Sequence, residues 1–338
     1  MYKVVLTDYA WPDLNLERET LSVCDAELIA THCSTEAEVL AATTNADAII
    51  TEYAPVTRGV IEAARKCKII SLNAAGYDNV DVKAASDEGV IVANVPDYCY
   101  DEVADHAMAL ILACARKVVR FCRDTSCKIW DFKSAGKIRR IRGQTLGLIG
   151  FGGIARNVGR KAKAFGLNII AYDPYVAEEV FKQEHVERIS LEGLLKRADF
   201  VSIHIPKTKE TEGLIGEKQL RMMKPNSHLI NTSRGGIVDE EALSRVVQEG
   251  AIEGAALDVL ECEPADFSSP LFACENVIIT SHCAFYSEEA MIEVRRRAVE
   301  AVVSVLSGEW PKNVVNRELF GRTNLRAGTL KQGKGNCT

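Results

Sequence analysis

The chain has 338 residues, of which 47% are hydrophobic and 26% are charged, and its formal net charge is -6. These values exclude an intrinsically disordered chain and a polybasic protein that binds nucleic acid. A chain of this length is expected to form two domains rather than one.

Cysteine usage and the N-terminus both favour the cytoplasm. The 11 cysteines are scattered and form no C-x-x-C pair, so reduced thiols are expected, with neither a disulfide framework nor a metal site. The first ten residues do not resemble a signal peptide, and the longest apolar run, 107–115, is too short to span a bilayer. We therefore expect a cytoplasmic protein with no membrane partner.

The first hundred residues alternate short β-rich runs with helical segments. Strands are predicted over 4–6, 28–30, 48–50, 69–72 and 90–93, with helices over 36–42 and 60–66. This alternation is typical of a parallel sheet covered by helices on both faces. In such sheets ligands bind at the carboxyl ends of the strands. The loop Asn73 to Gly76, which follows a strand directly, is therefore expected to offer backbone N–H groups to an anionic substrate.

Two long apolar stripes predict helices that flank a second unit. The first covers 101–123, and the second covers 287–306, where Ser287 is the expected N-cap. The second helix is expected to carry the chain back toward the first domain. We predict a substrate-binding domain over 1–100 plus 287–316, a nucleotide-binding domain over 101–286, and a weakly packed tail over 317–338.

A dinucleotide-binding fingerprint occupies Thr145 to Asp173. A short apolar run is followed by Gly150 and Gly152, a helix that begins near Gly153, and a second strand that ends at Asp173. The glycines permit a tight turn and a close approach of the backbone to a pyrophosphate, which would lie at the helix N-terminus. Asp173 would accept hydrogen bonds from ribose hydroxyls and repel a 2'-phosphate. The pattern predicts NAD as the cofactor.

Residues suited to chemistry follow three further predicted strands of this second sheet. Arg234 stands beside two glycines after 228–232, Glu263 follows 255–259, and His282 follows 277–280. Side chains at the carboxyl ends of neighbouring parallel strands can converge on one cleft. A surface ion pair of Arg234 with Glu263 is the alternative, but it leaves the glycines and the shared sheet edge unexplained.

From about 2 to 316 the chain resembles the D-isomer-specific 2-hydroxyacid dehydrogenase family. The matching segments are 76–81, 94–96, 147–152, 172–174, 204–206 with Thr211, 231–235, 258–264 and 281–284. The resemblance implies an α/β fold in which a Rossmann NAD-binding domain is inserted into a flavodoxin-like substrate-binding domain. It also implies a homodimer in which the nucleotide-binding domains form much of the contact.

The resemblance also implies roles for individual residues. His282 would donate a proton to the substrate carbonyl oxygen, Glu263 would raise the pKa of that imidazole, and Arg234 would hold the substrate carboxylate. The implied cofactor contacts are Gly150, Gly152, Gly153, Ile154, Asp173, His204, Pro206, Thr211, Thr232, Arg234, Asp258 and His282, with Asp258 on the nicotinamide carboxamide and Pro206 on the adenosine side. The expected substrate contacts are Tyr53, Ala74, Ala75, Gly76 and Arg234.

The sequence therefore predicts reversible hydride transfer between NADH and a small 2-keto acid, and it leaves two alternatives open. One is a D-3-phosphoglycerate dehydrogenase, although members with that activity often carry an arginine where this chain has Thr51 to Ala54. The other is an NAD(H)-sensing binding protein like the C-terminal-binding corepressors. No regulatory domain is expected after Asn316, and the acidic chain is not expected to bind nucleic acid.

Overall fold

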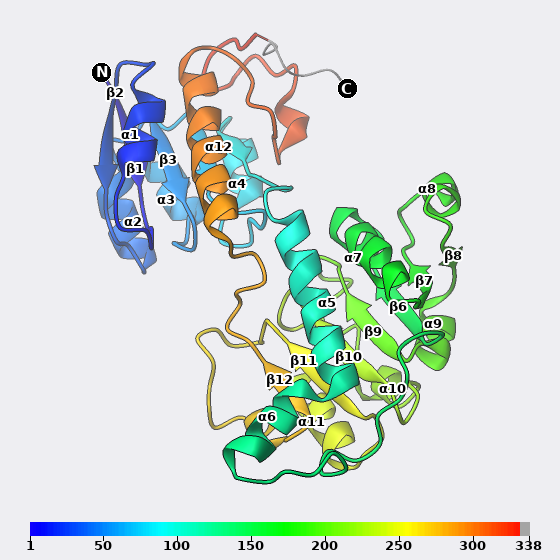
Figure 1. Cartoon of the computed structure of the whole chain (residues 1–338). Helices are drawn as coiled ribbons and strands as arrows, with labels where there is room; N and C mark the ends of the chain where they lie inside the picture. The colour runs from blue at the N-terminus through cyan, green and yellow to red at the C-terminus, as the bar shows by residue number, and fades with distance from the viewer. Residues whose placement is uncertain (332–338) are drawn as a thin grey trace. The chain divides into compact units, whose positions relative to one another are not determined.

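The computed structural model describes residues 1–331, and the chain divides into two compact units. One unit comprises Met1–Tyr98 together with the chain from Ser287 onward, and the other comprises Cys99–Tyr286 (Figure 1). The second unit is thus an insertion in the sequence of the first. Part of the predicted tail, 332–338, lies outside the described residues.

The first unit is built on a five-stranded parallel sheet in the order β2-β1-β3-β4-β5, the flavodoxin-like order that the resemblance implies. Its strands are β1 (Tyr2–Leu6), β2 (Ala26–Ala30), β3 (Ala48–Thr51), β4 (Ile69–Leu72) and β5 (Ile91–Ala93). Its α-helices are α1 (Asn15–Leu21), α2 (Glu36–Thr43), α3 (Arg58–Ala63), α4 (Val82–Asp87) and α12 (Glu288–Leu306). The short helices α1 and α4 were not predicted from the sequence.

Apolar residues on both faces of this sheet explain why its strands are almost continuously hydrophobic. On one face Val4, Leu6 and Ile50 pack with Val299 and Val302 of α12. On the other face a separate cluster includes residues of α2, α3 and α4. The side chain of Ser287 caps α12 by accepting a hydrogen bond from Ala290 N. The returning helix therefore supplies part of the core of the first unit.

The prediction of a weakly packed tail is wrong for residues 317–331. Leu319 and Leu325 are buried in the core that α12 covers. The Arg326 guanidinium donates hydrogen bonds to the carbonyl oxygens of Ile61 and Ala64, which end helix α3. The segment packs through isolated contacts rather than through a periodic face. Its sequence therefore carried no helical or strand signal.

The second unit contains a seven-stranded parallel sheet in the order β12-β11-β10-β9-β6-β7-β8, which confirms the Rossmann prediction. Its strands are β6 (Thr145–Ile149), β7 (Asn168–Tyr172), β8 (Glu187–Arg188), β9 (Phe200–Ile203), β10 (His228–Asn231), β11 (Gly254–Leu257) and β12 (Val277–Ile279). Its α-helices are α5 (Tyr100–Arg116), α6 (Val118–Ser126), α7 (Gly153–Ala164), α8 (Glu178–Gln183), α9 (Leu191–Arg197), α10 (Glu217–Leu220) and α11 (Glu240–Gln248). Short 3-10 turns at Pro270–Ala273 and, in the first unit, Arg317–Leu319 complete the fold.

The single helix predicted over 101–123 is two helices, α5 and α6, separated at Lys117. Lys117 has a left-handed backbone with φ of 53°, which interrupts the helical ladder. Its ammonium group donates hydrogen bonds to Ala135 O and to Glu253 Oε1, both at 2.8 Å. Within residues 1–331, no helix combines the length and the apolar character that crossing a membrane requires.

Candidate active site

The glycine turn after β6 has the geometry of an anion site. Gly150 has φ of 90°, and a Cβ built there would lie 2.4 Å from His204 O, so only glycine fits. Gly152 is the N-cap of α7, and a Cβ at that position would meet no heavy atom within 4 Å. Ala155 is fully buried on the inner face of the helix. The first turn of α7 can therefore be approached closely by a phosphate group.

Asp173 ties the end of β7 to the glycine turn. Its Oδ2 accepts a hydrogen bond from Phe151 N at 2.9 Å, and its Oδ1 accepts from the N–H groups of Tyr175 and Val176. A carboxylate has about four acceptor positions, so roughly one stays available to a ribose hydroxyl. The negative charge thus lies beside the first turn of α7, where it would repel a 2'-phosphate.

A buried hydroxyl without a partner marks the carboxyl end of β10. Thr232 is 8% exposed, and within residues 1–331 its Oγ1 has no hydrogen-bond partner. Such a group is costly unless a bound molecule satisfies it. Together with the open first turn of α7, this unsatisfied hydroxyl shows that the residues present fit a dinucleotide.

The loop that carries Arg234 is held by the side chain of Asn231, the last residue of β10. Asn231 Oδ1 accepts from Ser233 N, and its Nδ2 donates to the carbonyl oxygen of Arg234 at 2.9 Å. The guanidinium of Arg234 donates to Ser233 O at 2.8 Å. These bonds fix the arginine at the strand end, where it can present further donors to a carboxylate.

His282 and Glu263 form a short hydrogen-bonded pair. The distance from Nδ1 of His282 to Oε2 of Glu263 is 2.6 Å, and Oε1 of Glu263 accepts from Leu260 N at 2.9 Å. Burial alone would raise the pKa of Glu263, but the hydrogen bonds from His282 and Leu260 outweigh it and hold this pKa below its usual value. The ionised carboxylate accepts from Nδ1–H, so Nε2 is the nitrogen that can exchange a proton with a substrate.

Backbone strain at His282 is maintained by Asp258 at the end of β11. His282 has φ of 51°, a left-handed conformation that costs energy for a non-glycine residue. The buried Asp258 carboxylate accepts from Cys283 N at 3.0 Å and from Ala284 N at 2.9 Å, the two amides after the histidine. The backbone of Asp258 also accepts from His282 N at 2.7 Å. The imidazole is therefore held by a preorganised loop.

Thr280 and His106 extend the hydrogen-bond network of Asp258. Thr280 Oγ1 donates to Asp258 Oδ1 at 2.6 Å, and Nε2 of His106, on α5, lies 3.0 Å from that hydroxyl. The ligand atoms of His106, Asp258 and Cys283 lie within 4.8 Å of one another, but these hydrogen bonds account for their grouping. Sequence reasoning assigned Asp258 to the nicotinamide carboxamide. Its hydrogen bonds hold the loop that carries His282, and the contact with the carboxamide stays a prediction.

The remaining predicted cofactor residues lie after β9. Nε2 of His204 is 2.8 Å from Ser202 Oγ, and burial lowers the pKa of His204 to about 4, so this ring is neutral. Thr211 Oγ1 donates to Pro206 O at 2.7 Å and thereby closes the loop that follows. Ile154, the second residue of α7, is half-buried. All these groups lie at or near the carboxyl edge of the sheet that also ends in Arg234, Glu263 and His282.

The predicted substrate loop of the first unit follows β4. Asn94 Nδ2 donates to Ala75 O at 2.7 Å, and Val95 N donates to Ala74 O at 3.0 Å. The backbone N–H groups of Ala74, Ala75 and Gly76 donate no hydrogen bond to any other part of residues 1–331. The loop is thus fixed through its carbonyl groups, and its N–H groups can bind an anion. Tyr53, after β3, is 62% exposed.

Two acidic residues lie at this edge of the first sheet; sequence reasoning missed Asp8 and considered Glu52 only as a group that suits a phosphate poorly. Asp8, after β1, accepts hydrogen bonds from the backbone N–H groups of Glu52, Tyr53 and Ala54. Glu52 is 9% exposed, and burial, with a smaller contribution from the charge of Asp8, raises its pKa to about 7. The available signal was that each acid lies within two residues of the end of a buried strand.

A glutamine at position 52 is expected to change the pH dependence of stability. Because the folded state raises the pKa of Glu52 from 4.5 to about 7, it binds the proton more tightly than the unfolded chain. The free energy of unfolding should therefore fall by up to about 3 kcal/mol as pH rises through this interval, and Glu52→Gln should lack that loss. Urea denaturation of both proteins between these pH values measures the difference. If the free energy of unfolding changed with pH by the same amount in both proteins, the raised pKa of Glu52 would be contradicted.

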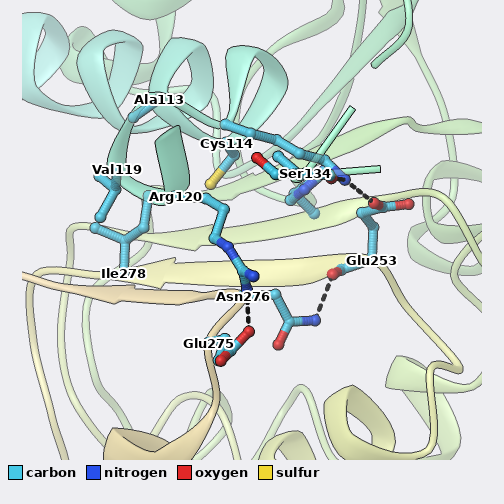
Figure 2. Close-up of a pocket in the computed structure, with 12 residues that line it drawn as sticks. Ala113, Cys114, Val119, Arg120, Ser134, Glu253, Glu275, Asn276 and Ile278 are labelled. Carbon is cyan, nitrogen blue, oxygen red and sulfur yellow. Dashed lines mark hydrogen bonds and ion pairs between the residues drawn. The ribbon is translucent and has the colours of Figure 1, made fainter. Parts of the chain in front are cut away.

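A cavity of about 260 Å³ lies at the other edge of the second sheet (Figure 2). Its polar lining includes Lys117, Arg120, His228, Glu253 and Glu275. Arg120 pairs with Glu275, and Lys117 pairs with Glu253. Burial lowers the pKa of His228 to about 4. His228 begins β10, whereas Arg234 follows the end of this strand, so this cavity is separate from the candidate active site.

Comparison with known proteins agrees with this arrangement. Residues 108–284 match the model of the "D-isomer specific 2-hydroxyacid dehydrogenase, NAD binding domain". The second unit is therefore an NAD-binding domain. The chain belongs to the D-isomer specific 2-hydroxyacid dehydrogenase family.

Named relatives differ in their activities and lengths. The chain is 42% identical over 268 residues to a glyoxylate reductase of Korarchaeum cryptofilum, covering 78% of this chain and 81% of that protein. It is also 42% identical over 284 residues to a D-3-phosphoglycerate dehydrogenase of Methanocaldococcus jannaschii, covering 83% of this chain. The match spans only 54% of the latter protein. A solved D-lactate dehydrogenase of Aquifex aeolicus, in complex with NAD and lactic acid, has a TM-score of 0.85 and 28% identity, with 93% of this chain and 99% of that chain covered.

Proposed function

We propose that the protein is an NAD-dependent D-2-hydroxyacid dehydrogenase that interconverts a small 2-keto acid and its D-2-hydroxy acid. The observation that carries this proposal is the 2.6 Å hydrogen bond between His282 and Glu263, which lie in the loops after two neighbouring strands of the NAD-binding sheet. This pair supplies a positioned proton donor at the edge where Rossmann sheets bind their ligands.

The proposed chemistry divides between the cofactor and the protein. NADH, when bound at the glycine turn, supplies the hydride that reduces the carbonyl carbon. His282 gives the proton at Nε2 to the carbonyl oxygen, and Glu263 stabilises the imidazolium before that transfer. Arg234 holds the substrate carboxylate through its guanidinium and polarises the keto group. In the reverse direction His282 takes the proton back from the hydroxyl group.

Substrate binding is assigned to Tyr53, to the backbone N–H groups of Ala74, Ala75 and Gly76, and to Arg234. Within residues 1–331 the N–H groups of the Ala74 to Gly76 loop donate no hydrogen bond, which supports this assignment because three successive donors suit a carboxylate. The cofactor contacts expected from the sequence, including Asp258, stay a proposal with this function.

A substrate panel tests the proposed function. Steady-state NADH oxidation should be measured with glyoxylate, pyruvate, hydroxypyruvate and phenylpyruvate. The wild-type protein should reduce at least one of these acids much faster than the His282→Ala protein does. If it reduces none faster, the proposed dehydrogenase activity is wrong.

NADH should be preferred over NADPH. The carboxylate of Asp173 beside the glycine turn would face the 2'-phosphate of NADPH, and such like-charge contacts cost several kcal/mol in an interface. We expect kcat/KM for NADH to exceed that for NADPH by at least about tenfold. Kinetics with both cofactors at one keto-acid concentration measure the ratio. Equal values would refute the role given to Asp173.

We further propose a homodimer that forms through the NAD-binding unit. Exposed apolar side chains in and after α6 support it, because Trp130 is 93% exposed, Phe132 is 81% exposed and Val118 is 56% exposed. Cytoplasmic localisation likewise stays a prediction.

Replacing Trp130 by alanine is expected to weaken this dimer. Buried aromatic anchors carry much of the binding energy in interfaces, so the dissociation constant should rise by about 10- to 100-fold. Sedimentation equilibrium measures it, with Tyr175→Ala as control, since this exposed tyrosine lies far along the chain from α6. A wild-type monomer, or an unchanged dimer in Trp130→Ala, would contradict the proposal.

D-3-phosphoglycerate dehydrogenase activity is the second candidate, because a relative with 42% identity carries that name. It requires cationic groups for the phosphate, and 51–54 contains Glu52 instead. Oxidation of 3-phosphoglycerate more efficient than that of D-glycerate would favour this candidate.

A further inference from the structure

We propose that Glu240 is a positioning residue for the proposed reaction. Through a hydrogen-bonded clamp with Glu261, it fixes the loop that carries Glu263 against the loop that carries Arg234. The inference rests on the proposed function and deepens it, because it names a residue that acts through the two groups assigned to catalysis. All residues of the clamp lie in the second unit.

The clamp consists of two glutamates, each of which accepts a hydrogen bond from the backbone of the other. Glu240 is the first residue of α11, and Glu261 lies in the loop after β11. Oε1 of Glu240 accepts from Glu261 N at 2.5 Å, and Oε1 of Glu261 accepts from Glu240 N at 3.3 Å. This is the reciprocal pattern of a capping box, but here it joins a helix to a separate loop. Two bonds in opposite directions fix both the distance and the orientation of the two segments.

On one side, the clamp orders the loop that carries Glu263. Leu260 N, the amide next to the clamped one, donates to Oε1 of Glu263 at 2.9 Å. The other oxygen, Oε2, is the partner of His282 at 2.6 Å. A backbone that is free at residue 261 would therefore also release the amide that orients the carboxylate beside the proton donor.

On the other side, the clamp restrains the loop that carries Arg234. The next residue is Gly235, and a Cβ built there would lie 1.8 Å from Leu260 O, so the two loops touch backbone to backbone. The chain that leads on to α11 is held by a parallel bridge between Ile215 and Val238. The clamp and these contacts together fix the guanidinium relative to the proton donor.

The clamp brings three carboxylates close together, which is unfavourable for stability alone. Burial raises the pKa of Glu240, and the charges of Glu261 and Glu263 add to this effect against the opposing hydrogen bond from Glu261 N. Proteins keep such unfavourable arrangements mainly where function requires them. The position of Glu240 beside Glu263 therefore agrees with a role in the candidate active site.

Proton NMR of the full-length protein with isotope-labelled histidine tests the clamp without turnover. The proton between Nδ1 of His282 and Glu263 should give a downfield signal, identified by its loss in His282→Ala. Glu240→Ala should shift this signal upfield or broaden it. Glu240→Gln should retain it, because glutamine keeps an oxygen acceptor for Glu261 N. Unchanged signals of the other histidines show that each variant is folded.

Kinetics with the best 2-keto acid provide the second readout. In Glu240→Ala, kcat/KM should fall by about 10- to 100-fold, because small displacements of catalytic groups are costly, while KM for NADH changes little. Glu240→Gln should recover most of the loss. Glu240→Asp, whose acceptor is one methylene too short, should show the same two changes to a smaller degree, and it decides the matter if Glu240→Ala does not fold.

A matched control is the adjacent Glu241, whose side chain is 91% exposed. Glu241→Ala should retain both the signal and kcat/KM. A wild-type signal and wild-type kcat/KM in the folded Glu240 variants, or equal losses at the two positions, would overturn the proposal. If the signal responds as expected but the wild-type protein reduces no 2-keto acid, the clamp stands and the proposed dehydrogenase activity fails.

Discussion

Replacing His282 by alanine is expected to lower kcat by about 10²- to 10⁴-fold, the usual contribution of a positioned general acid. The variant loses the imidazole that pairs with Glu263 and is proposed to give a proton to the carbonyl oxygen. Most of the affinity for NADH should be retained, because the glycine turn and Asp173, which are proposed to hold its pyrophosphate and ribose, are untouched. Stopped-flow measurement of a single turnover separates the chemical step from product release.

A matched control exists in the same unit. His185 also has a left-handed backbone, with φ of 52°, but it is exposed at the end of α8. His185→Ala should retain wild-type kcat. A His282→Ala protein with a kcat within a factor of about three of the wild-type value would remove His282 from the mechanism, because a loss that small is below the usual share of a general acid.

Breaking the buried ion pair between Glu17 and Arg295 is expected to destabilise the first unit strongly. Arg295 Nε lies 2.7 Å from Oε1 of Glu17, which is 1% exposed, and the guanidinium also packs over the ring of Trp11. Replacing Arg295 by methionine leaves a buried carboxylate without its partner. The loss should be about 3 to 5 kcal/mol in the free energy of unfolding.

Denaturant unfolding measures this loss, and Lys83→Met provides the comparison. Lys83 forms an exposed ion pair with Asp87 one helical turn away, and such pairs contribute about 0 to 1 kcal/mol. Similar losses for Arg295→Met and Lys83→Met would show that burial does not govern the first pair. The double variant Glu17→Met with Arg295→Met should recover part of the stability, since no unpaired charge remains.

Elements with a local signal were predictable from the sequence. Gly150 and Gly152 stand between an apolar run and a helical stripe, and the turn requires a residue without a Cβ at Gly150. The αβ alternation predicted both parallel sheets, and the strands ended within a few residues of the expected positions. Arg234 and His282 were singled out because polar residues at strand ends of such a sheet share one edge.

Features that depend on tertiary contacts were not predictable. The break at Lys117 depends on hydrogen bonds to Ala135 and Glu253, which lie far along the chain. The buried tail depends on the fit of Leu319 and Leu325 against the core of the first unit. The spacing of apolar and polar residues along the sequence does not predict either contact.

The candidate active site also has features that depend on tertiary contacts and could not be predicted. The sequence shows that residue 52 is a glutamate, but the burial of its side chain arises only when β3 and β4 pair. The hydrogen bonds of Asp258 to the amides of Cys283 and Ala284 were not predicted, and its assignment to the cofactor stays a prediction. Residue types at strand ends thus predicted which groups could do chemistry, and the structure added how they are held.

One measurement tests the central claim most directly: the stoichiometry and chirality of the product formed from hydroxypyruvate and NADH. The account predicts that each NADH oxidised yields one D-glycerate, resolved by chiral chromatography, and that His282→Ala forms almost none. NADH oxidation without a 2-hydroxy acid product, or a product of the L configuration, would contradict it.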